Sequence, residues 1–153
     1  MIPKPTIDIL SKIQTIESEL SSLKEEFTKS TKTDNCTRVL IIAPNDDLNA
    51  VQYLREKINL FDSSIKIMVL SPTDYEQNKT SIKDFSKIIA VGGYISNSFT
   101  NFHLHTITTL FNQNEVFIGT NGNKAFTYGE TMKNTHDAVH LFSDKYLVKF
   151  LTE

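Results

Sequence analysis

Residues 38–43, RVLIIA, and residues 87–91, KIIAV, decide the fold class. Both are short, nearly continuous apolar runs in which valine and isoleucine predominate. Such runs are typical of strands buried on both faces, whereas a half-buried strand alternates between polar and apolar residues. The two runs therefore predict central strands of a sheet that has helices on either side.

Further β-rich runs and amphipathic segments alternate around these two strands. Additional strands are expected at residues 65–70, 115–119 and 138–142. Helices are expected at residues 48–61, 74–85, 99–111, 123–133 and 144–151. This alternation predicts an α/β fold in three layers, with a flavodoxin-like, doubly wound parallel sheet of about five strands.

Composition excludes several classes of function. With 16 basic against 18 acidic residues the net charge is −2, so no global positive field attracts a polyanion, and we expect no nucleic-acid partner. The single cysteine, Cys36, has no second cysteine for a disulfide or a zinc site. The longest purely apolar stretch, residues 39–44, is too short to span a bilayer, and residues 1–10 contain no apolar signal segment. We therefore expect a cytoplasmic protein without membrane association.

A heptad pattern precedes the α/β region. Apolar residues recur at alternating spacings of four and three, at Ile9, Ile13, Ile16, Leu20, Leu23 and Phe27. The pattern predicts a coiled-coil-type helix from about Thr6 to Lys29 with one apolar seam. Residues 30–35 are polar and aperiodic, as in a linker. We therefore expect an N-terminal helix and linker at residues 1–35 and a single α/β domain at residues 36–153.

The charges beside the seam favour pairing between identical chains. In a parallel pair, Lys12 would face Glu17 and Glu19 would face Lys24. Exposed pairs contribute roughly 0.2–0.5 kcal/mol each, so they influence orientation while the seam supplies affinity. We expect a homo-oligomer or a helical protein partner. The alternative is that the helix folds back onto its own domain.

Three loops follow expected strands, where ligands of open α/β sheets bind. In the first, Asn45, Asp46 and Asp47 could cap the next helix or bind a cation. In the second, VGGYISNS at residues 91–98, Gly92 and Gly93 let backbone approach a ligand beside Ser96, or simply form a tight turn. This loop matches neither G-x-G-x-x-G nor a P-loop.

The third loop contains Thr120, Asn121 and Gly122, an ordinary Asn-Gly turn signal. In a doubly wound sheet it would lie beside the Gly92 loop and could complete a polar pocket. The three loops together are our candidate ligand-binding site.

Motifs for catalysis or for a bound metal are not found. His103 and His105 are two apart on an expected helix, which turns them to opposite sides. His136 and His140 have helical metal-pair spacing, but His140 lies in an expected strand, and the Glu of a zinc-hydrolase motif is missing. No serine lies in G-x-S-x-G. We therefore expect no catalytic residue, no metal and no cofactor.

The order of elements also resembles the layout of a two-component receiver domain over residues 38–151. The shared features are the acidic residues Asp46 and Asp47 after the first strand, Thr120 after the fourth and Lys145 after the fifth. The resemblance implies a phosphoacceptor aspartate after the third strand, where this chain has Val91-Gly92-Gly93, and the acidic pair comes later than in the family. The resemblance is thus one of architecture and not of membership.

Two hypotheses for function follow. The first is a non-catalytic oligomerising or protein-interaction module with a regulatory role, whose α/β domain docks a partner or senses a small ligand. The alternative is a small enzyme acting on a phosphorylated or nucleotide-like ligand at the carboxyl ends of the strands, with Asp46 or Asp47 as acid, base or cation ligand.

Overall fold

A computed structural model describes residues 37–80 and 85–153. The strands are β1 (Arg38–Ile42), β2 (Lys66–Leu70), β3 (Lys87–Val91), β4 (Thr108–Gln113), β5 (Val116–Asn121) and β6 (Lys124–Gly129). The α-helices are α3 (Leu48–Phe61), α4 (Pro72–Asn78), α5 (Ser98–His103), α6 (Met132–Lys145) and α7 (Leu147–Thr152). Two short 3-10 helices are η1 (Asn45–Asp47) and η2 (Leu104–Thr106).

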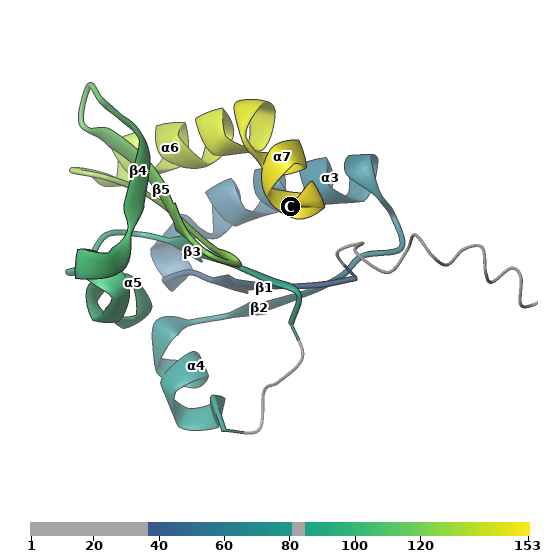
Figure 1. The fold of residues 1–153 in the computed structure, drawn as a ribbon. Helices are drawn as coiled ribbons and strands as arrows, with labels where there is room; N and C mark the ends of the chain where they lie inside the picture. The colour runs from purple at the N-terminus through teal and green to yellow at the C-terminus, as the bar shows by residue number, and fades with distance from the viewer. Residues whose placement is uncertain (1–36, 81–84) are drawn as a thin grey trace, which may run out of the picture. The chain divides into compact units, whose positions relative to one another are not determined.

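The described strands form one mixed sheet of six strands in the order β2-β1-β3-β6-β5-β4 (Figure 1). Strands β2, β1, β3 and β6 are parallel, whereas β5 is antiparallel to both of its neighbours, β6 and β4. The expected flavodoxin-like parallel sheet of five strands is therefore wrong. The expected coiled-coil helix at residues 1–35 lies outside the described residues.

A tight hairpin between β4 and β5 accounts for the mixed sheet. Its two turn residues, Asn114 and Glu115, have φ values of 55° and 62°. Positive φ at both positions is the mark of a type I′ turn, whose twist matches antiparallel strands. The expected helix at residues 99–111 ends at His103 for this reason, and η2 leads into β4. Phe102 and Leu110, two of its supposed buried residues, are 80% and 44% exposed.

In the C-terminal part of the chain, one expected helix is a strand and one expected strand is part of a helix. The expected helix at residues 123–133 is wrong, because β6 occupies most of this segment and pairs between β3 and β5. The expected strand at residues 138–142, AVHLF, is also wrong, since it lies inside α6. Its Ala138, Val139 and Phe142 are fully buried along one side of that helix, so their apolar run reflects helical burial.

Helices α3, α6 and α7 cover one face of the sheet, and α4 and α5 cover the other (Figure 1). The first face packs Val39 and Ile41 against Leu54 of α3 and Phe142 of α6. The second face packs a smaller cluster, which contains Leu40, Ile42, Ala90, Phe99 and Phe126. Strand β1 is thus buried on both sides, which explains its continuous apolar run.

The connections that follow the parallel strands β1 and β3 run to opposite faces of the sheet. After β1 it passes through α3 on one face to β2, and after β3 it passes through α5 on the other face (Figure 1). Neighbouring strands with diverging connections create a crevice at their carboxyl ends. Asn97 is fully buried there, and its Nδ2 donates to the carbonyl oxygens of Ile42 at 3.0 Å and Val91 at 2.8 Å. This amide ties the two strand ends together.

The two edges of the sheet differ. Strand β2 forms one edge and β4 the other. The pairing of β4 with β5 shifts register between Thr109 and Phe111, so the β4 edge is irregular. Within the described ranges, no helix has the length and hydrophobicity needed to cross a membrane.

Candidate functional site

A pocket of about 600 Å³ lies at the end of the sheet formed by the carboxyl termini of β1, β3 and β6. The loops after these three strands form most of its wall, and the β4–β5 hairpin supplies the remainder. Its position coincides with the crevice between the diverging connections from β1 and β3. The described fold therefore places a cavity where α/β sheets bind ligands.

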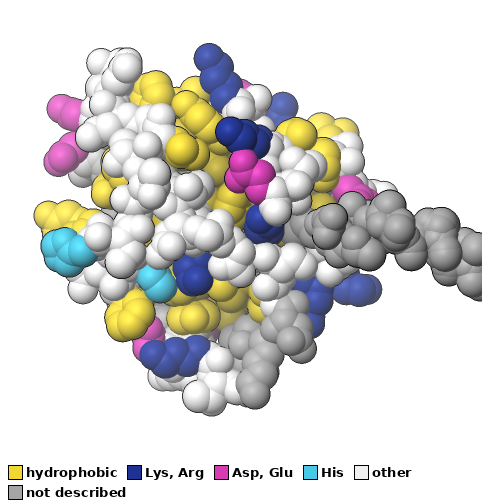
Figure 2. All heavy atoms as spheres, in the orientation of Figure 1, with side chains coloured by type: hydrophobic (Ala, Val, Ile, Leu, Met, Phe, Trp, Pro, Cys, Tyr) yellow, Lys and Arg dark blue, Asp and Glu magenta, His cyan; other side chains and the backbone are white. Residues whose placement is uncertain are grey.

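Acidic side chains dominate the charge of the pocket. Asp46, Asp47, Glu115 and Glu130 line it, and none of its described lining residues is Lys or Arg. On the face of the domain shown in Figure 2, by contrast, basic and acidic side chains are interspersed. A cavity lined by charges of one sign concentrates the electric field, so this pocket attracts cations.

Asp47 is the most enclosed of these carboxylates. Its side chain is 8% exposed, and it occupies the residue before α3 without making a capping hydrogen bond. Its Oδ1 lies 3.8 Å from Nε2 of His136, which is beyond hydrogen-bond length. Burial raises the pKa of Asp47 and Asp46 adds to this rise, while His136 opposes it. The Asp47 side chain is thus largely buried, opens onto the pocket and makes no hydrogen bond to a described residue.

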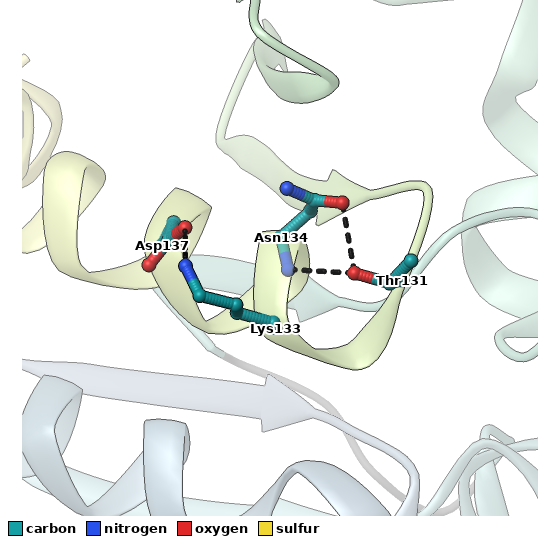
Figure 3. Close-up of polar contacts among 4 residues, drawn as sticks. All are labelled: Thr131, Lys133, Asn134 and Asp137. Atoms are coloured by element: carbon teal, nitrogen blue, oxygen red, sulfur yellow. Dashed lines mark hydrogen bonds and ion pairs between the residues drawn. The ribbon is translucent and has the colours of Figure 1, made fainter.

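His136 lies near the start of α6. The hydroxyl of Thr131 caps this helix. It accepts a hydrogen bond from the backbone nitrogen of Asn134 at 3.1 Å and donates one to the side-chain Oδ1 of Asn134 at 2.8 Å (Figure 3). Lys133 pairs with Asp137 at 3.2 Å along the same helix (Figure 3). Within the described part of the chain, Nε2 of His136 is buried without a hydrogen-bond partner. Asp47, which lines the pocket, and Nε2 of the adjacent His136 are thus two polar groups without a hydrogen bond to a described residue.

An aromatic wall adjoins the carboxylates. The rings of Phe117 and Tyr128 lie 4.7 Å apart, centre to centre, and both line the pocket. Gly93 leaves space beside them, because a Cβ at this position would lie 3.2 Å from Cδ1 of Tyr128. At the rim, Tyr94 and Ile95 are 50% and 88% exposed. The pocket thus combines negative charge with apolar and aromatic surface.

Gly92 serves the tight turn after β3. Its φ is +105°, a conformation that side chains disfavour. A Cβ here would lie 3.0 Å from Oγ of Ser96 and 3.3 Å from Cδ of Pro44. The hydroxyl of Thr100 donates to the Gly92 carbonyl at 2.9 Å and fixes the turn from the α5 side. Glycine is therefore required here for backbone shape.

The candidate residues chosen from sequence lie at two opposite ends of the parallel strands. Asp46, Asp47, Gly93 and Ser96 line the pocket, and Asn45 and Gly92 belong to the same loops. The other end, where the parallel strands begin, contains Thr120, Asn121 and Gly122. There the Asn123 carbonyl accepts a hydrogen bond from the backbone amide of Ile88 at the start of β3.

The expected closeness of the Gly92 and Thr120 loops is wrong because β5 runs antiparallel to β6. For the same reason Thr120 is remote from Asp46 and Asp47. Lys145 is the last residue of α6 and follows no strand. The arrangement that resembled a receiver domain is therefore not formed.

Sequence reasoning missed the pocket residues of the last third of the chain. The missed side chains include Glu115, Phe117, Tyr128, Glu130 and Thr131. A signal for some of them was available, because Asn114-Glu115 separates two β-rich runs by two residues, as in a hairpin. An antiparallel hairpin there would have placed Glu115 at the carboxyl ends of the parallel strands.

The described carboxylates do not converge on one point. Among residues 37–80 and 85–153, no three His, Cys, Asp or Glu side chains come close enough to hold a metal ion together. No three of the four carboxylates that line the pocket therefore meet at one point among the described residues. Negative charge without a single focus, beside aromatic rings, suits an organic cation, which contacts its site over an extended surface.

Comparisons of the chain with protein-family models, with curated proteins and with solved structures found no match.

Proposed function

We propose that this protein is a non-catalytic binding module that senses a small organic cation, an amine, in the acidic pocket. Asp47 is the counter-ion for the ligand's ammonium group. The observation that carries the proposal is this carboxylate, which is 8% exposed, lines the pocket and makes no hydrogen bond to a described residue. A buried carboxylate without such partners is costly, and an ammonium donor in the pocket would offset that cost.

The surroundings of Asp47 support the same class of ligand. Three further carboxylates raise the local concentration of cations. The rings of Phe117 and Tyr128 pack against each other and both line the pocket, so they provide aromatic surface for a cation or its alkyl substituents.

The pocket gives less support to a phosphorylated ligand. Four carboxylates line it, and no described lining residue is basic, so phosphate would be repelled. The start of α6 attracts anions through its dipole, but a helix terminus is worth only about 0.3–1 kcal/mol. The enzyme hypothesis, which depended on such a ligand, is therefore the weaker of the two.

A thermal-shift and calorimetry panel tests the proposal. Primary and quaternary amines, inorganic phosphate and nucleotides would be compared at equal ionic strength. We expect only amines to raise the unfolding temperature, since a ligand at one hundred times its Kd stabilises the fold by about 2.7 kcal/mol.

The decisive variant is Asp47→Asn, which keeps the shape of the side chain and removes its charge. It should weaken amine binding about tenfold or more, as expected for loss of a charge-assisted contact. Asp74→Asn is the matched control, because Asp74 is exposed on α4, which covers the other face of the sheet from α3 and α6. Equal amine binding by the Asp47 variant and the intact chain would refute the proposal.

A further inference from the structure

We infer, on the basis of the proposed function, that the ammonium group belongs to a lysine side chain of a protein partner, whose apolar residues pack on the rim of the pocket. The observation that carries this inference is a set of large apolar side chains that line the pocket and are also exposed to solvent. They are Tyr94, Ile95 and Met132, which are 50%, 88% and 53% exposed. Side chains that both line a cavity and face solvent lie at its opening, and these three form the apolar rim.

The turn after β3 holds two of the rim residues at the surface. The backbone nitrogen of Asn97 donates to the Gly93 carbonyl at 2.9 Å, which closes the turn around Tyr94 and Ile95. The side chain of Asn97 is fully buried and donates to the carbonyl oxygens at the ends of β1 and β3. The turn is therefore tied to the sheet, and a surface that is already ordered loses less entropy when it binds.

The third rim residue comes from a second element. Met132 is the first residue of α6, directly after Thr131, whose hydroxyl caps the helix by accepting from the Asn134 backbone nitrogen at 3.1 Å. Single exposed apolar side chains are common on proteins, but several of them around one cavity indicate a binding surface. The rim is thus built by the loops after β3 and β6, at the opening of the acidic pocket.

A polypeptide fits this combination better than a free amine does. An amine held at Asp47 would leave the rim in water, whereas a partner can place a lysine in the pocket and the neighbours of that lysine on the rim. The methylene stem of a lysine can also pack on the aromatic wall of Phe117 and Tyr128. Exposed apolar loops can also contact membranes, but the four carboxylates that line the pocket would be repelled by an anionic membrane surface.

The test compares three capped tripeptides by isothermal titration calorimetry on the full chain: acetyl-Leu-Lys-Leu-amide, acetyl-Gly-Lys-Gly-amide and acetyl-Leu-Gln-Leu-amide. We expect the first to bind at least about tenfold more tightly than the second, because its leucines bury apolar surface on the rim. It should also bind at least about tenfold more tightly than the third, which has no ammonium group. Equal binding of the glutamine peptide would overturn the inference.

The double variant Ile95→Ser with Met132→Ser should lose most of the preference for the leucine-flanked lysine over the glycine-flanked one. Leu60→Ser is the matched control and should keep that preference, because Leu60 is 81% exposed on α3 and is not among the described residues that line the pocket. A preference that survives in the double variant, or that the Leu60 variant loses equally, would show unspecific apolar attraction and overturn the inference.

The outcomes distinguish the inference from the proposed function. Equal affinity of the intact chain for the two lysine peptides, with binding that depends on Asp47, overturns the inference and leaves the amine-binding function in place. The same holds if free butylamine binds in a manner that depends on Asp47 and neither lysine peptide binds. Failure of butylamine and of both lysine peptides to bind in this manner overturns the proposed function itself.

Discussion

Asp47, the proposed counter-ion for the ligand, is a largely buried carboxylate in the folded chain. Its carboxylate is buried beside the pocket, 3.8 Å from His136, and burial raises its pKa. The folded chain therefore holds this proton more tightly than the unfolded chain does. Its contribution to the free energy of unfolding is most favourable at low pH and falls as the pH rises from the ordinary carboxylate range through the raised pKa.

At the residue scale we therefore predict that Asp47→Asn stabilises the fold at neutral pH. The free energy of unfolding should rise by about 1 kcal/mol at pH 7, because an incompletely paired buried charge is removed. The gain should disappear near pH 3, where the carboxyl is protonated in both states. Urea unfolding at the two pH values measures this difference, with Asp74→Asn as the control. A variant less stable than the intact chain at pH 7 would contradict the prediction.

At the scale of elements, the β4–β5 hairpin contains a costly residue. Glu115 has a φ of 62°, where asparagine and glycine are the preferred residues of such turns. Its side chain nevertheless lines the pocket. Backbone strain of this kind persists where the surrounding structure or a function requires it.

We predict that Glu115→Gly stabilises the hairpin and weakens amine binding. Relief of the left-handed conformation should increase the free energy of unfolding by about 1 kcal/mol, measured by urea denaturation. Glu115→Gln separates the two effects, because it removes the charge and keeps the strain, so its stability should match that of the intact chain. If Glu115→Gly unfolded at a lower urea concentration than the intact chain, the turn would not be strained as described.

The elements that could be predicted from sequence are those whose local pattern agrees with their environment. Strands β1, β2 and β3 and helix α3 lie at their expected positions because continuous apolar runs and a clear helical stripe identify them. Between Phe99 and Phe142 the expected strand at residues 115–119 is present as β5, but the segments on either side of it were misassigned. Their short apolar runs suit a helix and a strand equally well. Only pairing with distant strands decides between these, and sequence periodicity does not contain that information.

The part of the candidate site that follows β1 and β3 was predictable from sequence, and the part formed by β5 and β6 was not. The loops after β1 and β3 were found because parallel strands place their carboxyl ends at one edge. Glu115, Tyr128 and Glu130 were missed because their place depends on the direction of β5 and on the insertion of β6 between β3 and β5. Because β5 runs antiparallel to β6, Thr120 lies at the opposite end of the sheet, where the parallel strands begin.

At the scale of the whole molecule, the heptad seam at Ile9, Ile13, Ile16, Leu20, Leu23 and Phe27 lies outside the described residues and stays a prediction. We expect the full chain to form an oligomer at micromolar concentration, or to bind a helical protein partner, because an apolar helical seam needs a second surface. Light scattering of the full chain and of a variant lacking residues 1–33 measures this. A monomeric full chain that binds no helical partner would refute it.

The shift of register in β4 has a consequence for solutions crowded with this protein. A straight outer strand offers an unbroken row of amides and carbonyls on which a neighbouring molecule can align. The break between Thr109 and Phe111 interrupts that row on one flank of the sheet. Molecules that meet along this flank consequently find no continuous template, which disfavours growth into fibrils there.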